Sequence, residues 1–321
     1  MIGLFAVLVV LFSLGATVAM AAIAGVRQIE HVLLRFDPIW LPVLLGGLVV
    51  SFFGYRLAFE RMVWNDDGHG LTVRQRFEVV AAGFGAFVHR GGTAVDRYVM
   101  RATGVAKREG DVRLAALQSL EMVPIAVGAF AAACIAVFVG GPTMPSFGFD
   151  IPWIVGPLVG APLALGLVFF FRRSLRTATG WRYWIGVALD GLWMLQAGVM
   201  RERRRRLAVL GMAVFTFGEL VTVWSAMAAF GFRMSVVGVV LGYGVGYVVS
   251  RRSAPLGGAG LIDVMLIVAL WSAGAPLAVA IVGTFVYRFF NLWCSIPVAL
   301  ASLRSLRGLA PASAATGGGA G

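Results

Sequence analysis

Six charged residues lie within or beside long apolar runs of this 321-residue chain: Asp96, Arg97, Glu121, Glu219, Asp263 and Arg288. A charge at membrane depth costs about 2.5–3.5 kcal/mol on insertion scales, so such residues usually line a cavity or pair with one another. Arginine can hold two phosphate oxygens at once through its planar fork. These residues therefore predict a phosphate-binding site, with Arg288, Arg90 and Arg97 as its cations. The alternative is that Arg288 pairs with Asp263 or Glu121 only to fix helix packing.

Glycines interrupt the same regions. Gly91 and Gly92 precede Asp96, and Gly257, Gly258 and Gly260 precede Asp263. A break there would leave backbone N–H groups unpaired at a helix start, which is a ready anion site. A tight turn between helices explains the same glycines.

Glu219 lies in the middle of an apolar run, where loss of water favours the protonated carboxyl. It is a candidate for proton coupling, and an interhelical hydrogen bond is the alternative. Gly238, Gly242 and Gly246 follow the four-residue spacing of close helix packing.

The composition excludes a water-soluble enzyme. Hydrophobic residues make up 60% of the chain and charged residues only 13%, and the mean hydropathy is +0.88. The net charge of +12 comes almost wholly from arginine, in tracts between apolar runs. Such tracts indicate membrane topology and contacts with anionic lipid rather than nucleic-acid binding. The two cysteines, Cys134 and Cys294, lack the neighbours of a metal or redox site.

We expect an all-α integral membrane protein of about eight transmembrane helices, because about 20 apolar residues cross a bilayer. The predicted spans are 2–25, 39–58, 118–140, 151–171, 207–230, 234–250, 261–275 and 277–300. Two further apolar stretches, 77–95 and 184–200, have arginines on both sides and are expected to be re-entrant or interfacial. The positive-inside rule then places both termini in the cytoplasm.

The chain is expected to form one membrane domain over 1–307, with halves 1–150 and 151–307, followed by a disordered tail over 308–321. The halves contain a weak repeat. Asp96 and Asp263 are separated by about half the chain, and each follows a glycine pair. Glu121 lies as far after Asp96 as Arg288 lies after Asp263. In the expected topology these segments run in opposite directions, which predicts an inverted repeat with a binding site where the repeats meet.

At these residues the chain resembles the lysylphosphatidylglycerol synthase transmembrane family, whose members are flippase-like membrane proteins. The segment from Ala254 to Asp263, followed by Gly274 and by Tyr287-Arg288, is similar to the family's Pro-Gly-x-Gly-x-acid motif and last-helix arginine. The segment from Gly91 to Arg97 is similar to its first motif. His89-Arg90 stand where a proline is usual, and aspartate replaces glutamate in both motifs, which points to a different substrate. The resemblance implies the lipid-translocating part, without the soluble aminoacyl-transfer domain.

Together these observations predict that the chain flips an anionic phospholipid or a polyprenyl-type lipid phosphate across a bacterial inner membrane, as a transporter and not an enzyme, with no cofactor or metal. The expected substrate-binding residues are Arg90, Gly91, Gly92, Asp96, Arg97, Glu121, Pro255, Gly257, Gly258, Gly260, Asp263 and Arg288. Two alternatives stay open. One is a non-transporting partner of a lipid-modifying enzyme, and the other is a head-group enzyme using Asp66, Asp67 and His69. A second copy of the chain or a lipid-synthesis enzyme would be the protein partner.

Overall fold

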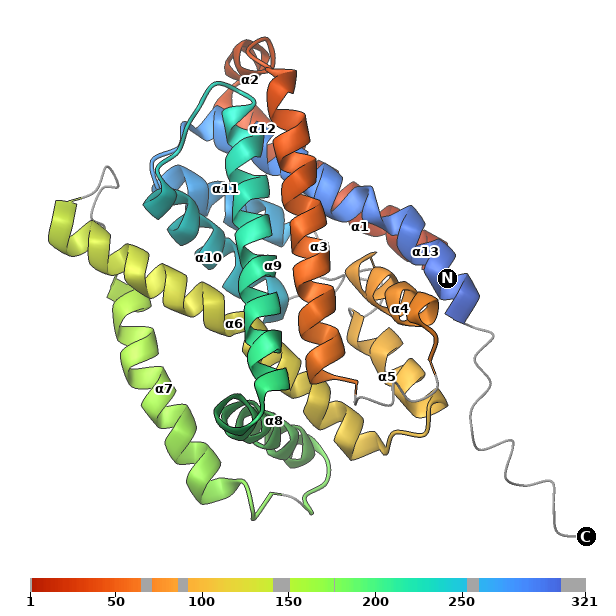
Figure 1. Cartoon of the computed structure of the whole chain (residues 1–321). Helices are drawn as coiled ribbons and strands as arrows, with labels where there is room; N and C mark the ends of the chain where they lie inside the picture. The colour runs from red at the N-terminus through yellow and green to blue at the C-terminus, as the bar shows by residue number, and fades with distance from the viewer. Residues whose placement is uncertain are drawn as a thin grey trace, which may run out of the picture. The chain divides into compact units, whose positions relative to one another are not determined.

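The computed structural model describes residues 2–64, 71–85, 92–140, 151–175, 177–252 and 260–306, and these residues form helices joined by turns, with no strand among them (Figure 1). The all-α prediction is therefore confirmed for this part of the chain. The helices are α1 (Ile2–Ala24), α2 (Val26–Leu33), α3 (Leu41–Met62), α4 (Val73–Gly85), α5 (Gly92–Ala102), α6 (Lys107–Ile135), α7 (Ile151–Phe171), α8 (Trp181–Arg201), α9 (Arg203–Ala228), α10 (Val236–Arg252), α11 (Leu261–Ser272), α12 (Leu277–Arg288) and α13 (Ser295–Leu306). Short irregular helical turns, η1 (Pro38–Trp40), η4 (Ala136–Gly140) and η6 (Phe289–Trp293), adjoin α3, α6 and α12.

Five helical stretches are long and apolar enough to cross a membrane: Pro38–Met62, Lys107–Val139, Ile151–Phe171, Arg203–Ala228 and Leu277–Leu306. The stretches Val10–Ala24 and Val26–Leu33 would add a sixth only as a pair, and they are bent by 106°. The prediction of eight spans is therefore met in part. Within 234–250 the apolar part of α10 is short, and α11 has 12 residues, or about 18 Å at 1.5 Å per residue, too little for a full crossing.

The described residues of the two predicted re-entrant or interfacial stretches are also helical. The stretch 77–95 contains the end of α4 and the start of α5, and residues 86–91 between them lie outside the described part. The stretch 184–200 lies within α8, which is not among the candidate spans. The predicted tail, 308–321, also lies outside the described residues.

The chain forms two compact units, each assembled from three separate segments. The first unit contains Met1–Phe52, Val123–Gly160 and Val214–Cys294, and the second contains Phe53–Met122, Ala161–Ala213 and Ser295–Gly321. Each unit thus draws on both of the halves expected from the sequence.

Glycine governs the closest helix contacts in the first unit. Helices α3 and α9 lie side by side (Figure 1), and a Cβ added at Gly218 would meet the Gly47 carbonyl oxygen at 2.5 Å. Antiparallel α10 and α11 meet in the same way, because a Cβ at Gly242 would lie 2.8 Å from Leu270 and one at Gly246 would lie 2.8 Å from Leu266. The packing role predicted for these two glycines is confirmed.

A small alanine-rich core completes the first unit. The second half of α6 contributes Ala129, Ala132, Ala133 and the neighbouring Ala136, and α10 contributes Leu241. Trp153 of α7 packs against this cluster. Small side chains allow close approach of the helices, as is typical of helices that associate in a membrane.

Candidate functional site

The first polar feature of the first unit is the start of α11. Gly260, just before the helix, has φ +82°, a conformation that side-chain-bearing residues rarely adopt. Its N–H donates a hydrogen bond of 3.1 Å to Oδ2 of Asp263. The aspartate is buried in the first turn of the helix, where the positive end of the helix dipole favours a negative charge. Gly260 and Asp263 thus form one local capping structure.

Arg288, the last residue of α12, pairs with this aspartate. Its Nε lies 2.6 Å from Oδ1 of Asp263, and the side chains of Arg288 and Asp263 are 11% and 1% exposed. The pairing anticipated from the sequence is therefore confirmed as a contact. Among the described residues, no other ion pair of Arg288 is found, and the contact with Asp263 is ionic: neither Nε of Arg288 nor Oδ1 of Asp263 has a hydrogen-bond partner.

The backbone changes directly after Arg288. Residues Phe289–Trp293 form a π-helical turn, which ends with the Cys294 N–H donating to the Phe289 carbonyl at 2.9 Å. Single π turns inside helices are rare and are frequently found at functional sites. The turn carries Asn291 into the second polar cluster of this unit.

This second cluster surrounds Glu219 of α9, which is 2% exposed. Its Oε1 accepts hydrogen bonds from the Ser51 hydroxyl at 2.6 Å and from Nδ2 of Asn291 at 2.9 Å. Its Oε2 accepts from the Tyr287 hydroxyl at 2.5 Å and from the Tyr243 hydroxyl at 3.3 Å. The interhelical hydrogen bonding given as the alternative for Glu219 is therefore present, and it joins α9 to α3, α10, α12 and η6. Proton coupling by Glu219 stays a prediction.

Both clusters are built on adjoining residues of the same helix. Tyr287 contacts Glu219, and the next residue, Arg288, contacts Asp263. The result is a buried cation, two carboxylates and several hydroxyl and amide donors in a largely apolar unit. A guanidinium in this setting can hold a carboxylate through one edge and a phosphate through another.

The remaining described candidates lie in the second unit. Arg97 pairs with Asp111 of α6 at 2.7 Å, and the Tyr183 hydroxyl of α8 donates to the same aspartate at 2.8 Å. Burial raises the pKa of the Asp96 carboxyl well above its usual value, and the adjacent Arg97 charge opposes that shift. Arg97 thus ties α5 to α6.

Glu121 is buried in α6, also in the second unit, and Gly92 begins α5. Arg90, Gly91, Pro255, Gly257 and Gly258 lie outside the described residues, as do Asp66, Asp67 and His69 of the enzyme alternative. The structure therefore brings Gly260, Asp263 and Arg288 together, and describes Asp96, Arg97 and Glu121 in the other unit. No group of three or more His, Cys, Asp or Glu within the described ranges could hold a metal ion.

Sequence reasoning missed the four partners of Glu219. Ser51, Tyr243, Tyr287 and Asn291 are between 24 and 168 residues away from it along the chain. Uncharged polar residues are common in apolar helices, so nothing in their types or spacing distinguished these four. The position of Tyr287 beside Arg288 was the one available signal.

Comparison of the chain with protein-family models, with curated proteins and with solved structures finds no match. The resemblance to the flippase-like family therefore stays an expectation that rests on its motifs.

Proposed function

We propose that this chain moves an anionic phospholipid or a lipid-linked phosphate between the leaflets of a membrane, with Arg288 as the residue that binds the phosphate. The observation that carries the proposal is the ion pair between Arg288 and Asp263, placed between the start of a short helix and a π-helical turn. Irregular backbone beside buried charge is the arrangement by which membrane transporters hold a polar group at depth.

The surrounding helices support this proposal. Five described stretches are long and apolar enough to cross a membrane, and α12 begins one of them, Leu277–Leu306, whereas α11 before it has only 12 residues. Short apolar helices joined at a break typically form the substrate sites of transporters. Asp263 would hold Arg288 in place when no phosphate is bound, so that a phosphate would share or replace the carboxylate as its partner.

The test is leaflet exchange in vesicles. Purified protein is reconstituted with fluorescent phosphatidylglycerol, and with fluorescent phosphatidylcholine as the zwitterionic control. We expect the wild-type protein to exchange the anionic lipid and Arg288→Ala to abolish that exchange. Arg288→Lys keeps the charge but loses the planar fork, so it should fold better than Arg288→Ala and still transport poorly.

Arg304→Ala is the matched control, because Arg304 is an exposed arginine in the same apolar stretch, Leu277–Leu306. It should transport like the wild-type protein. Normal exchange by correctly folded Arg288→Ala would remove this residue from the mechanism. Failure of the wild-type protein to exchange any lipid of a broad panel would instead favour a non-transporting membrane partner.

A further inference from the structure

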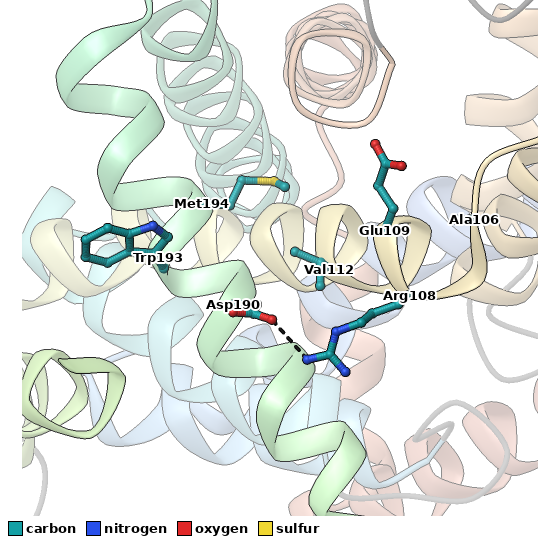
Figure 2. Close-up of a pocket in the computed structure, with 7 residues that line it drawn as sticks. All are labelled: Ala106, Arg108, Glu109, Val112, Asp190, Trp193 and Met194. Atoms are coloured by element: carbon teal, nitrogen blue, oxygen red, sulfur yellow. Dashed lines mark hydrogen bonds and ion pairs between the residues drawn. The ribbon is translucent and has the colours of Figure 1, made fainter. Parts of the chain in front are cut away.

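The second unit contains an open pocket of about 450 Å³ between the start of α6 and the middle of α8. Figure 2 shows its seven lining residues: Ala106, Arg108, Glu109, Val112, Asp190, Trp193 and Met194. In Figure 2 Arg108 reaches from α6 to Asp190 of α8, while Glu109 points to the other side of α6. The residues of the proposed transport site do not line this pocket.

The charges at the pocket favour an anion. Asp190 accepts from Nη2 of Arg108 at 3.0 Å and lies 3.4 Å from Nε of Arg172, so one carboxylate faces two guanidinium groups. Glu109 is already paired with Arg113. Of the lining residues, Arg108 is positive and Glu109 and Asp190 are negative. The partner arginines Arg113 and Arg172, which do not line the pocket, bring the sum of the whole cluster to one positive charge, and each carboxylate of the lining has an arginine partner.

Arg108 still has donors to offer. Its side chain is 31% exposed, and its ion pair with Asp190 uses one terminal nitrogen. In Figure 2 the other terminal nitrogen points away from Asp190. The free edge of a guanidinium matches two oxygens of a phosphate group.

The rest of the pocket is apolar. Val112 and Met194 line it beside Ala106, and Trp193 is 43% exposed. The guanidinium carbon of Arg172 lies 4.2 Å from the centre of that ring, which keeps a second positive charge close to the indole. A ligand that fits must therefore carry both an anionic group and an apolar part.

The position of the pocket along the helices indicates the depth at which it would lie in a membrane. It lies at the charged end of the candidate span Lys107–Val139, where Lys107, Arg108 and Arg113 are clustered. On α8, Trp181 and Trp184 are exposed as well as Trp193. Exposed tryptophans and arginines at the end of a span are typical of the lipid head-group region.

We infer that this pocket binds an anionic phospholipid, with Arg108 holding the phosphate and Trp193, Val112 and Met194 contacting the glycerol and the first acyl carbons. The inference rests on the pocket alone and would hold whether or not the chain transports lipid. Because both carboxylates of the lining are paired with arginines, and the cluster with these partners carries one positive charge, the ligand is expected to be a phosphatidylglycerol-like lipid rather than a zwitterionic one.

The test is native mass spectrometry and thermal unfolding of the full chain in detergent, with phosphatidylglycerol, phosphatidylcholine or inorganic phosphate added. We expect phosphatidylglycerol to remain bound and to raise the unfolding temperature, and the other two to do so much less. Arg108→Gln should weaken phosphatidylglycerol binding about tenfold or more, as expected for the loss of a charge-assisted hydrogen bond. Arg173→Gln removes the same charge from an exposed arginine that does not line the pocket and should bind normally.

A second variant guards against misfolding of Arg108→Gln. Ala106 is exposed and precedes α6, so Ala106→Phe would fill the pocket without changing any charge. It should also weaken lipid binding. Equal losses in Arg108→Gln and Arg173→Gln would show that binding follows net charge alone, and normal binding by Ala106→Phe would show that the lipid lies elsewhere. Equal binding of phosphatidylcholine, or binding of inorganic phosphate as tightly as the lipid, would also overturn the inference.

Discussion

The ion pair between Asp263 and Arg288 makes each residue depend on the other. Both side chains are largely buried, and the distance of 2.6 Å leaves no room for water between Nε and Oδ1. Removing one partner leaves the other charge buried without compensation, which typically costs about 3–5 kcal/mol.

We therefore expect Asp263→Ala and Arg288→Ala each to lower the unfolding temperature in detergent strongly, and the double variant to regain part of the loss. Unfolding measurements on the four proteins of this double-mutant cycle provide the test. Simple addition of the two losses would show that the contact contributes no coupling energy.

Asp96 presents the opposite case, a buried carboxyl beside a partly exposed arginine. Burial raises its pKa in the folded protein, so unfolding releases a proton at pH values between the unfolded pKa of about 4 and the higher folded-state pKa. The stability that comes from the protonated form is fully present below about pH 4 and falls as the pH rises toward the folded-state pKa.

Asp96→Asn removes this titration. We expect the wild-type protein to lose stability relative to Asp96→Asn as the pH rises above about 4, with a constant difference below that value. Unfolding of both proteins in detergent across this range provides the measurement. Parallel stability profiles would mean that Asp96 does not titrate differently in the folded and unfolded states.

At the scale of single residues, the sequence was informative where charge was rare. Asp263 and Arg288 were identifiable because a charge in an apolar run needs a partner, and the structure supplies it. The partner of Arg97 was not identifiable. Asp111 lies in a stretch rich in charges, Lys107 to Arg113, where many pairings were equally reasonable before the helices were placed.

Helix crossings in this chain depend on which glycines of a helix face a neighbour. In α3, Gly46 and Gly47 are adjacent, but they meet different surroundings. A Cβ at Gly46 would meet nothing within 4 Å, whereas one at Gly47 would lie 2.5 Å from Oγ1 of Thr222 and 2.9 Å from the Gly218 carbonyl oxygen.

We expect Gly47→Ala to destabilise the protein by about 1–3 kcal/mol through overpacking. Gly46→Ala, the matched control, should leave stability unchanged or raise it slightly, because alanine is the better helix former. Thermal unfolding of the two variants in detergent separates the effects. Equal behaviour would mean that α3 and α9 can move apart without loss.

Two similar turns in the backbone bear on the predicted internal repeat. After α5, Gly104 has φ +83°, and the Val105 N–H donates to the Met100 carbonyl. After α11, Gly274 has φ +102°, and the Ala275 N–H donates to the Leu270 carbonyl. Like the two aspartates of the sequence motifs, these turns are separated by about half the chain.

Alignment on these turns differs from alignment on the two motifs. Asp263 lies farther before Gly274 than Asp96 lies before Gly104, and the difference is about one helical turn. The two aspartates are therefore not equivalent when the turns are superposed. The sequence repeat matched Asp96 with Asp263 because both are acidic residues that follow a glycine pair. The backbone turns, which the sequence repeat did not include, give a different match.

Spans were overcounted where a short apolar helix was taken for a full crossing. The break between 261–275 and 277–300 was predicted at the right place, but α11 has only 12 residues before Gly274, and the apolar part of α10 is also short. A window of apolar residues measures composition and does not show how many of those residues form one continuous helix. Helix type was predictable from apolar length, whereas the exact length of each helix depended on local backbone conformation.

Across the whole molecule, exposed apolar surface is the strongest argument for a membrane setting. Only 6% of the apolar window of α7 is buried within the protein, and Phe169 and Phe170 are 78% and 75% exposed. A soluble protein rarely leaves so large an apolar patch exposed to water. Composition had already indicated this class, since long apolar runs with few charges are typical of helices surrounded by lipid.

The orientation of the chain leads to a final prediction. Arginine tracts before α4 and around α5 belong on the cytoplasmic side by the positive-inside rule, so α4 and α5 together should enter and leave the membrane on that side. Arg74, whose side chain is 85% exposed, lies in α4, and Arg108, whose side chain is 31% exposed, lies at the start of α6. We expect single cysteines at these two positions to react with an impermeant thiol reagent from the same, cytoplasmic, face.

The experiment needs Cys134 and Cys294 replaced by serine first, because Cys294 is exposed and Cys134 is partly exposed. Single cysteines at Arg203 and Arg233 calibrate the two faces, since they lie just at and just beyond the ends of the candidate span Arg203–Ala228. Arg203 should label with the cytoplasmic pair, and Arg233 should label from outside. Labelling of positions 74 and 108 from opposite faces would show that the segment containing α4 and α5 crosses the membrane. The matching segments of the two halves would then cross the membrane in the same direction. The repeat would not be inverted, and a binding site between inverted repeats would be ruled out.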